Sequence, residues 1–384
     1  MNKEKLTDLI RLSWWGTGTV VADRDIYEEM KQQTIAVLPA DCLSSLGLSH
    51  ELLHEWKKHI LEQLVLYDHY LHEQTNLPIS VPYVVLKGTA AAQYYPHPEY
   101  RMMGDIDIMT RREDFNIAYQ QLLDHGFHAE KVLNREASLV RGWVAVELHQ
   151  RFASLNDPDQ AKYFDDLIID NITPSHTLPD PINGLVILEH ISKHMESGLG
   201  LRQIIDWMMF VDKCLPDEKW PEFCQMAAKI NIDKLAIVTT KMCEKYLGLP
   251  HREWCADADT DLCDQLMEYI LSCGNFGNKM TSDAAISENA FAFASTPKMA
   301  FKLLQMQGLT NWKAAKEHKI LKPFAWIYQA FRYASRGLKR KGAVSKIKAE
   351  YSAAMKRNAM LNSLCVTRQE KGMAILKDGK YVKE

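Results

Sequence analysis

The sequence predicts an α+β protein, in which a small mixed β-sheet interrupts a chain that is otherwise mostly helical. Apolar residues recur at helical spacing over residues 49–74 and again through most of 181–363. Between these stretches, residues 79–150 change to short apolar or alternating runs, which are typical of strands. Of the 384 residues, 47% are hydrophobic, which is enough apolar material for two or three packed domains.

These changes of pattern divide the chain into five expected segments. They are a helical N-terminal segment (1–78), a sheet core (79–151), a linker (152–180), a larger helical domain (181–363) and a polar tail (364–384). The linker is rich in Asp, Pro, Asn and Ser, and Asp180-Pro181 after it is a typical helix start. Asp378-Gly379 indicates a hairpin turn or a loose tail.

The elements of residues 49–150 follow from local signals. Ser49 is a good N-cap for the long helix that follows it. Thr110 and Glu113 form a capping-box pattern for a later helix, which Gly126 terminates in a left-handed conformation. The other expected elements are strands at 82–86, 103–109, 138–140 and 143–149 and a short helix at 89–95.

Composition excludes several classes of protein. A net charge of −3 gives no overall indication of nucleic-acid or membrane binding. No run of about 18 apolar residues is present, and the N-terminal residues do not form a signal peptide, so we expect a cytoplasmic protein without a membrane span. The eight cysteines never form a C-x-x-C pair, which favours reduced, mostly buried thiols.

An acidic strand carries the strongest functional signal. Side chains alternate across a strand, so Asp105 and Asp107 share one face while Ile106 and Ile108 face the core. Two carboxylates this close repel each other unless a cation lies between them. Paired oxygen ligands without cysteine favour Mg²⁺ or Mn²⁺ over zinc.

A second strand supplies a third acid. In residues 143–149 the apolar residues alternate with Ala145, Glu147 and His149, which therefore share the other face. If this strand lies beside the first, Glu147 joins Asp105 and Asp107 as a metal ligand. His149 would then lie close enough to contact substrate or to order the site.

A glycine turn provides candidate phosphate ligands. Lys87-Gly88-Thr89 ends one strand and begins a helix, where glycine allows backbone N–H groups to approach phosphate oxygens. Lys87, Thr89 and Arg101 could add direct contacts to a triphosphate. The turn is not a Walker A loop, because the chain contains no GxxxxGK[ST].

Together these residues resemble a known family. The residues that carry the likeness are Leu86-Lys-Gly-Thr89, Arg101, Asp105-Ile-Asp107-Ile108, Leu122-x-x-x-Gly126-Phe127 and Glu147-Leu-His149. Their order is similar to an uncharacterised bacterial nucleotidyltransferase family of the DNA polymerase β-like superfamily. The superfamily often has Gly-Ser in the turn and Ser before the first acid, where this chain has Thr89 and Gly104.

The resemblance implies a fold, an activity and a set of ligands. The sheet core would be a nucleotidyltransferase core, transferring a nucleoside monophosphate from an NTP, for which we expect ATP, to an acceptor hydroxyl or amine. Asp105 and Asp107 would hold two Mg²⁺ or Mn²⁺ ions, and Glu147 would complete the catalytic ion or act as base. Gly88 and Thr89 would bind the phosphates.

Further polar residues accompany this core. His190 and His194 lie one helical turn apart, but no third metal ligand is evident, so substrate contact or a polar network with Arg202 and Asp206 is favoured. The stretch 298–348 combines Lys and Arg with aromatic residues at helical spacing. A buried stripe with a basic solvated face explains it, and RNA or anionic lipid binding is the alternative.

The leading hypothesis is a metal-dependent nucleotidyltransferase that modifies a small molecule or a protein. One alternative is an RNA-directed enzyme that uses the basic stretch, in particular Lys339, Arg340 and Lys341. Another is a non-catalytic nucleotide-binding or partner protein on the same fold, although three retained carboxylates speak against it.

Overall fold

A computed structural model describes most of the chain. The described residues are 3–155, 157–195, 198–279, 301, 304–305, 308–309, 311–338, 352, 355–366, 374–377 and 380–383. The chain divides into two compact units, the first comprising residues 1–279 with 364–384 and the second residues 280–363. None of the described helices combines the length and apolar composition that crossing a membrane requires.

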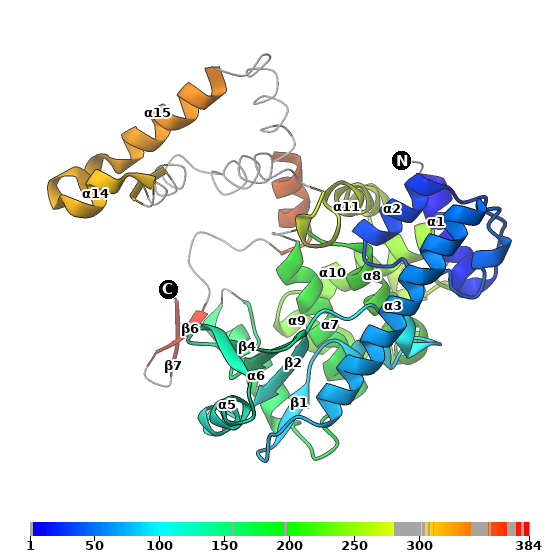
Figure 1. Cartoon of the computed structure of the whole chain (residues 1–384), viewed down its shortest axis with the longest axis horizontal. Helices are drawn as coiled ribbons and strands as arrows, with labels where there is room; N and C mark the ends of the chain where they lie inside the picture. Colours follow the sequence, from blue (N-terminus) through cyan, green and yellow to red (C-terminus); the bar gives the residue numbers. More distant parts are fainter. Residues whose placement is uncertain are drawn as a thin grey trace. The chain divides into compact units, whose positions relative to one another are not determined.

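The first unit combines a mixed sheet with many helices, so the predicted α+β class is confirmed (Figure 1). Its helices are α1 (Lys3–Trp15), α2 (Arg24–Gln32), α3 (His50–Thr75), α4 (Thr89–Ala92), α5 (Phe115–Asp124), α6 (Pro158–Asp170), α7 (Asp180–His194), α8 (Leu201–Cys214), α9 (Trp220–Lys229), α10 (Asp233–Met242) and α11 (Thr260–Cys273). Its strands are β1 (Tyr83–Val85), β2 (Ile106–Thr110), β3 (His128–Val132), β4 (Glu136–Arg141), β5 (Val144–His149), β6 (Ala374–Lys377) and β7 (Lys380–Lys383).

The main sheet has the strand order β1-β2-β5-β4-β3. β2 and β5 are parallel, whereas the other three neighbouring pairs are antiparallel. After the hairpin with β4, the chain therefore places β5 in the middle of the sheet, directly beside β2. Neither strand lies at an edge of the sheet, so both are paired on each side.

One face of the sheet forms the hydrophobic core. Ile106 and Ile108 of β2 pack with Val146 and Leu148 of β5 against residues of α3 and α5, and all four are essentially inaccessible to solvent. This is the apolar face that the alternation in both strands predicts. The polar residues between them necessarily point to the opposite face.

Helix α3 connects the N-terminal helices to the sheet. Ser49 caps it by accepting a hydrogen bond from the Leu52 backbone N–H at 3.3 Å, as predicted. Near the other end, the Tyr70 hydroxyl donates to the carbonyl of Gly104 at 2.8 Å. The helix therefore anchors the chain immediately before the acidic strand.

The N-terminal helices also pack against the later helices of the same unit. The Trp15 indole donates to the carbonyl of Leu247 at 2.8 Å. The Leu201 backbone N–H, at the start of α8, donates to the Gln33 side chain at 2.9 Å. Residues 1–78 are therefore integrated with the helices that follow the sheet.

Two local expectations are wrong. Strand β3 has no counterpart among the predicted elements, because its five side chains are all exposed and show no apolar alternation. Thr110 does not cap a helix: it ends β2, where it pairs with Tyr83, and α5 begins at Phe115. Pairing in the sheet therefore outweighs the capping-box pattern. Gly126 does adopt the predicted left-handed conformation, with φ +85°.

The segment 152–180 contains helix α6. A buried acid of this helix holds the first residues of the segment in place. Asp165 of α6 accepts hydrogen bonds from the backbone N–H groups of Phe152 and Ala153, both at 2.8 Å. Strands β6 and β7 flank Asp378-Gly379 and pair antiparallel, while these two residues themselves lie outside the described part of the chain.

All eight cysteines are free thiols in the structure. The expectation that most are buried holds for half of them. Cys243, Cys255, Cys263 and Cys273 are buried, and the others are partly or fully exposed.

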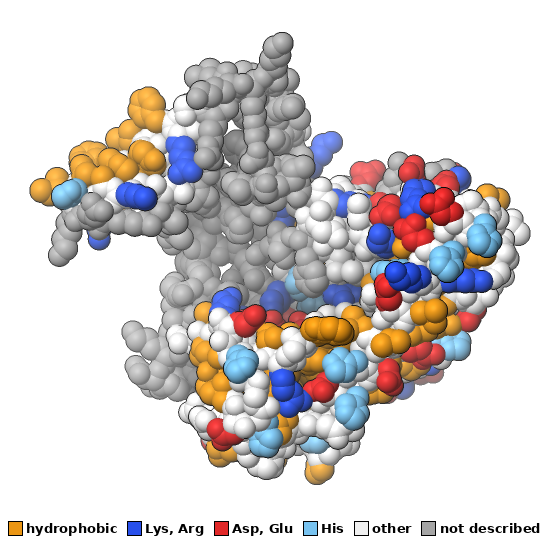
Figure 2. Space-filling view, in the orientation of Figure 1, with side chains coloured by type: hydrophobic (Ala, Val, Ile, Leu, Met, Phe, Trp, Pro, Cys, Tyr) orange, Lys and Arg blue, Asp and Glu red, His pale blue; other side chains and the backbone are white. Residues whose placement is uncertain are grey.

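The second unit contains α14 (Lys313–Glu317), a 3-10 segment (Lys319–Phe324) and α15 (Ala325–Leu338). The rings of Trp312 and Tyr328 stack at 5.1 Å, whereas Phe324 and Phe331 are exposed. Figure 2 shows apolar side chains gathered on the described helices of this unit. The basic residues Lys339, Arg340 and Lys341 lie outside the described residues, so a nucleic-acid footprint there stays a prediction.

Candidate active site

The register of β2 and β5 brings two acids together. Asp107 lies directly opposite Glu147 in this parallel pair, and both side chains leave the sheet on the face away from the core. Asp105 comes immediately before β2 and is half-buried. The carboxylates of Asp107 and Glu147, which are 40 positions apart in the chain, therefore meet on one face of the sheet.

The two oxygens of Asp107 have different surroundings. Oδ1 lies 2.6 Å from the Lys87 ammonium and 3.0 Å from Nε2 of His149. Oδ2 is buried and has no hydrogen-bond partner among the residues that the structure describes. Because an unpaired buried carboxylate oxygen is costly, Oδ2 requires a ligand that the side chains around it do not provide.

The charge of Asp107 raises the pKa values of the neighbouring acids. The lysine and His149 outweigh burial and hold the pKa of Asp107 well below its usual range. The negative charge of Asp107, together with burial, raises the pKa of Asp105. Burial and then the charge of Asp107 raise the pKa of Glu147. The cluster thus holds one firmly ionised carboxylate beside two that ionise less readily.

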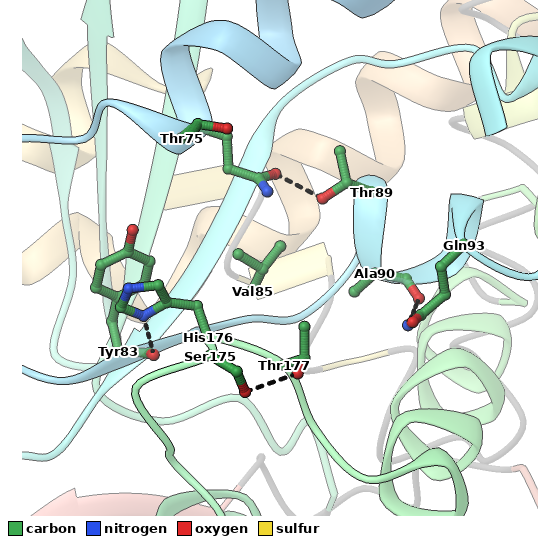
Figure 3. Close-up of a pocket in the computed structure, with 10 residues that line it drawn as sticks. Thr75, Tyr83, Val85, Thr89, Ala90, Gln93, Ser175, His176 and Thr177 are labelled. Carbon is green, nitrogen blue, oxygen red and sulfur yellow. Dashed lines mark hydrogen bonds between the residues drawn. The ribbon is translucent and has the colours of Figure 1, made fainter.

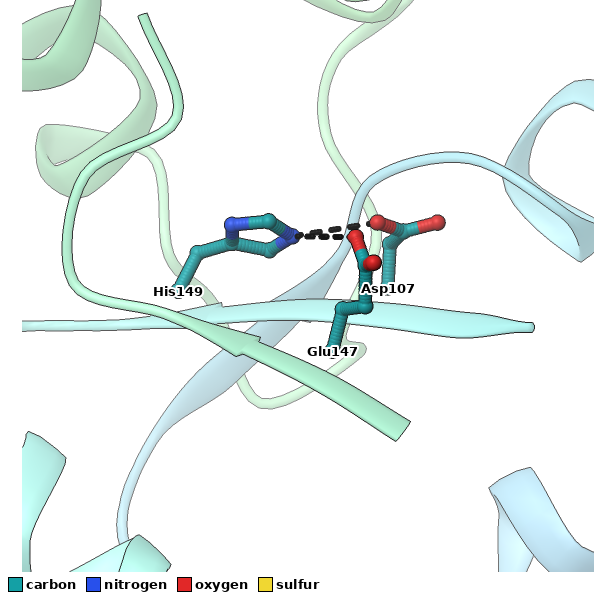
Figure 4. Close-up of side chains that lie close together, drawn as sticks. All are labelled: Asp107, Glu147 and His149. Atoms are coloured by element: carbon teal, nitrogen blue, oxygen red, sulfur yellow. Dashed lines mark hydrogen bonds and ion pairs between the residues drawn. The ribbon is translucent and has the colours of Figure 1, made fainter. Parts of the chain in front are cut away.

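These groups fit a divalent cation. Asp107, Glu147 and His149 each offer a ligand atom, and these atoms lie within 4.8 Å of one another (Figure 4). The Glu147 side chain is 30% exposed, so the cluster can be reached from solvent. The orphaned Oδ2 of Asp107 and the raised pKa of both neighbours show that a positive charge is favoured there.

Replacing Asp105 with Asn is expected to stabilise the protein in EDTA at pH 7. Folding raises the pKa of Asp105, so its ionisation in the folded state opposes folding at any pH above that raised value. The stabilisation by Asn should therefore shrink as the pH falls through this raised pKa toward the usual range of Asp, because Asp105 then becomes protonated in the folded state. A gain of about 1 kcal/mol corresponds to a few degrees in Tm.

Calorimetry at pH 7 and pH 4.5 measures this effect, and Asp68→Asn, on the exposed side of α3, is the control that should change little. A lower Tm for Asp105→Asn at pH 7 would contradict the charge repulsion inferred here.

Lys87 and Gly88 form the turn beside the acids. The Lys87 side chain is buried, and the charges of Asp107, Asp105 and Glu147 outweigh burial and raise its pKa. Gly88 has a φ of +56°, which favours glycine. A Cβ at Gly88 would lie 3.0 Å from the side chain of Met103 and 3.6 Å from the carbonyl of Asp105, so the turn passes close to the acidic strand.

Thr89 points into a different pocket. Its hydroxyl donates to the Gln74 side chain at 2.7 Å. Both residues line a pocket of about 310 Å³ in which Tyr83 and His176 stack at 3.9 Å (Figure 3). The lining residues are Gln74, Thr75, Tyr83, Val85, Thr89, Ala90, Gln93, Ser175, His176 and Thr177. This lining contains none of the predicted acids.

Arg101 and Asp206 pair with each other inside the protein. Two guanidinium nitrogens of Arg101 donate to the two carboxylate oxygens of Asp206, both at 2.8 Å. Tyr95 donates to the same carboxylate at 2.8 Å, and Arg202 donates to the carbonyl of Met102 at 3.1 Å. Polar residues of α8 therefore fix the backbone that leads into the acidic strand.

The two histidines of α7 are uncharged and lie near Lys87. The rings of His190 and His194 meet edge to face at 4.4 Å. Burial, followed by the charge of Lys87, lowers the pKa of His190 well below its usual range. Burial and the charge of Lys193 lower the pKa of His194 to about 3. Both rings are therefore uncharged at neutral pH. The positive charge of Lys87 contributes to the lowered pKa of each ring.

Two residues of this site are missing from the sequence-based list. Lys193 lies between the two histidines in sequence, and burial and the charge of Lys87 lower its pKa. Glu136 of β4 lies opposite His149 in the sheet, and its Oε2 is 3.5 Å from Nδ1 of that ring. A lone lysine on a helix resembles a solvated side chain, whereas Glu136 could have been found by counting back across the Gly142 hairpin.

Most of this chain matches a known protein family. The family described as "Uncharacterised nucleotidyltransferase" matches residues 25–248, which is more than half of the chain. The chain belongs to this nucleotidyltransferase family. No curated protein and no solved structure shows a significant match.

The matched range of this nucleotidyltransferase contains the whole five-stranded sheet, the acidic cluster and helices α7 and α8. Membership assigns nucleotidyl transfer as the general activity.

Proposed function

We infer that this protein transfers a nucleoside monophosphate from an NTP to a small-molecule or protein acceptor, with divalent cations held by Asp105, Asp107 and Glu147. The observation that carries this proposal is the parallel register of Asp107 and Glu147 together with the buried, unpaired Oδ2 of Asp107. When bound, Mg²⁺ or Mn²⁺ would neutralise the phosphates and polarise the reacting phosphoryl group.

A set of cations faces the acids and fits the triphosphate. Lys87 contacts Asp107, and its charge acts on Lys193 across the site. The charges of Lys87 and Arg202 both act on Asp105. These three side chains can bind phosphate oxygens, and the backbone at Gly88 can approach them closely because no Cβ intervenes. Arg101 supports this arrangement indirectly, through its ion pair with Asp206.

The proposed reaction is a displacement at the α-phosphorus of the NTP. An acceptor oxygen or nitrogen forms a bond to this phosphorus, and the bond to the bridging oxygen breaks, releasing pyrophosphate. The acceptor loses a proton, which Glu147 can accept through a carboxylate oxygen that does not bind the cation, because its side chain is 30% exposed whereas that of Asp107 is buried. In this proposal His190 and His194, whose rings are neutral, contact the acceptor or the nucleotide as hydrogen-bond donors.

Incubation with labelled NTPs tests this function. The protein is mixed separately with each of the four α-³²P-labelled NTPs, Mn²⁺ or Mg²⁺, and a lysate divided into small-molecule, protein and RNA fractions. We expect label from one NTP in the small-molecule or protein fraction, with pyrophosphate release and complete loss in EDTA. Label in the RNA fraction would establish RNA-directed addition instead. Absence of transfer with every NTP would contradict the proposal.

Metal binding should also stabilise the fold measurably. Mn²⁺ at about 100 times its Kd adds about 2.7 kcal/mol to the free energy of unfolding, if it binds only the folded state. We therefore expect Mn²⁺ to raise the Tm of the wild-type protein by several degrees in differential scanning calorimetry. The Glu147→Gln variant should show a much smaller increase. An equal increase in both proteins would place the bound metal away from Glu147.

A further inference from the structure

Three side chains from three neighbouring strands form a buried chain of contacts behind the acidic cluster. Glu136 lies on β4, His149 on β5 and Asp107 on β2. Oε2 of Glu136 lies 3.5 Å from Nδ1 of His149, an ion-pair distance without a hydrogen bond, whereas Nε2 of the same ring is hydrogen-bonded to Oδ1 of Asp107 at 3.0 Å. One ring thus connects two carboxylates on opposite sides of it.

The position of His149 is fixed from every side. The ring is completely buried, and it meets the ring of Phe152 edge to face at 5.9 Å. The antiparallel register of β4 and β5 sets Glu136 opposite His149, and the parallel register of β5 and β2 sets Met109 beside it. The sheet itself therefore determines which carboxylates this imidazole contacts.

These contacts decide which oxygen of Asp107 is free. His149 and Lys87 both contact Oδ1 and leave Oδ2 as the unpaired atom. Nε2 of His149 is also 3.6 Å from Oε2 of Glu147. The ring thus limits the rotation of both acids, because turning Asp107 to present Oδ1 would break two contacts.

We propose that His149 is a positioning residue, held by Glu136, which presents Oδ2 of Asp107 and the Glu147 carboxylate to a divalent cation. This inference rests on the proposed function, since it concerns the same acids. Outer partners of metal-binding carboxylates typically change metal affinity by about 10–100-fold when they are removed. Glu136 acts through His149 and does not contact the cation.

The alternative role for His149 is that of a direct metal ligand, since its Nε2 belongs to the group of atoms within 4.8 Å. The geometry favours positioning, because Nε2 is directed at Oδ1 of Asp107, the oxygen already shared with Lys87. A ligand role and a positioning role predict different spectra, so the two are separable by experiment.

Mn²⁺ binding to the full-length protein, followed by electron paramagnetic resonance without any nucleotide, tests the proposal. The variants are Glu136→Gln, His149→Gln and His149→Leu. Gln at position 149 can still donate an amide N–H to Asp107 but cannot also reach Glu136, and Leu can do neither. We expect about a 10-fold weaker Kd for each Gln variant and about a 100-fold weaker Kd for Leu.

His128→Gln and Glu130→Gln are matched controls, because they place the same substitutions on the exposed strand β3 of the same sheet. Both should bind Mn²⁺ as the wild type does. If His149→Leu does not fold, the test rests on Glu136→Gln, whose side chain is 16% exposed, with its Tm measured alongside.

Unchanged Mn²⁺ affinity in Glu136→Gln and His149→Gln would overturn the positioning role. So would a ¹⁴N hyperfine coupling to Mn²⁺ that is present in the wild type and lost in His149→Leu, because it would make the ring a ligand. A Glu147→Gln variant separates this failure from that of the proposed function: if it too binds Mn²⁺ normally, the acids are not the metal site at all.

Discussion

Replacing Glu147 with Gln is expected to lower the rate of nucleotidyl transfer by about a thousand-fold or more. The substitution removes one carboxylate from a cation site, and with it the group proposed to accept the proton. The bound metal contributes several kcal/mol of transition-state stabilisation, and a general base raises the rate by powers of ten. A change of about 1.4 kcal/mol in the activation free energy corresponds to a factor of ten in rate. Because Glu147 is 30% exposed and its pKa is raised, its ionised form does not stabilise the fold, and the variant should remain folded.

The rate of label transfer from the NTP identified in the lysate assay is the appropriate measurement. Asp107→Asn should lose at least as much activity, but it also leaves the buried ammonium of Lys87 without its closest partner, so a loss of stability would accompany the loss of activity. Glu130→Gln, on exposed β3, is the matched control and should keep wild-type activity. Less than a tenfold loss for Glu147→Gln would contradict its assignment to the site.

Replacing Asp206 with Asn is expected to cost about 3–5 kcal/mol of stability, the largest effect of any substitution considered outside the acidic cluster. Asp206 is almost completely buried and accepts both guanidinium hydrogen bonds of Arg101 as well as that of Tyr95. The neutral side chain would leave the charge of Arg101 buried without a counter-charge. The backbone between Tyr95 and Gly104 should loosen as a result.

Denaturant unfolding of Asp206→Asn measures the loss. The control is Arg24→Met, which removes an ion pair with Glu55 whose side chains are 47% and 41% exposed. Such exposed pairs contribute little to stability, so the control should be nearly neutral. If both variants lose the same stability, the Arg101–Asp206 pair does not have the structural role assigned to it.

Local alternation in the sequence predicts the orientation of the acids well. The pattern around Asp107 and Glu147 places their apolar neighbours in the core, and the structure has them there. That these two strands are adjacent depends on β5 being inserted beside β2. Strand order is decided by packing across the whole sheet, and no local pattern in this sequence specifies it.

Long-range pairing accounts for most of what the sequence does not show. Arg101 has the spacing of a phosphate ligand, but its partner Asp206 lies on a helix 105 positions later. Thr89 belongs to the predicted phosphate turn, yet its hydroxyl bonds with Gln74 of α3. In both cases a polar side chain buried on folding takes the nearest partner in space, which only the tertiary structure identifies. The sequence does not indicate Lys193 for the same reason, because its burial depends on the tertiary structure around it.

Anomalous diffraction from crystals of the full-length protein grown with Mn²⁺ would locate the bound cation. We expect an anomalous peak within about 2.0–2.4 Å of Oδ2 of Asp107 and of a Glu147 oxygen, with Asp105 also in reach. Ordered Mn²⁺ at other positions, with Asp107 and Glu147 bound only to protein side chains, would contradict it.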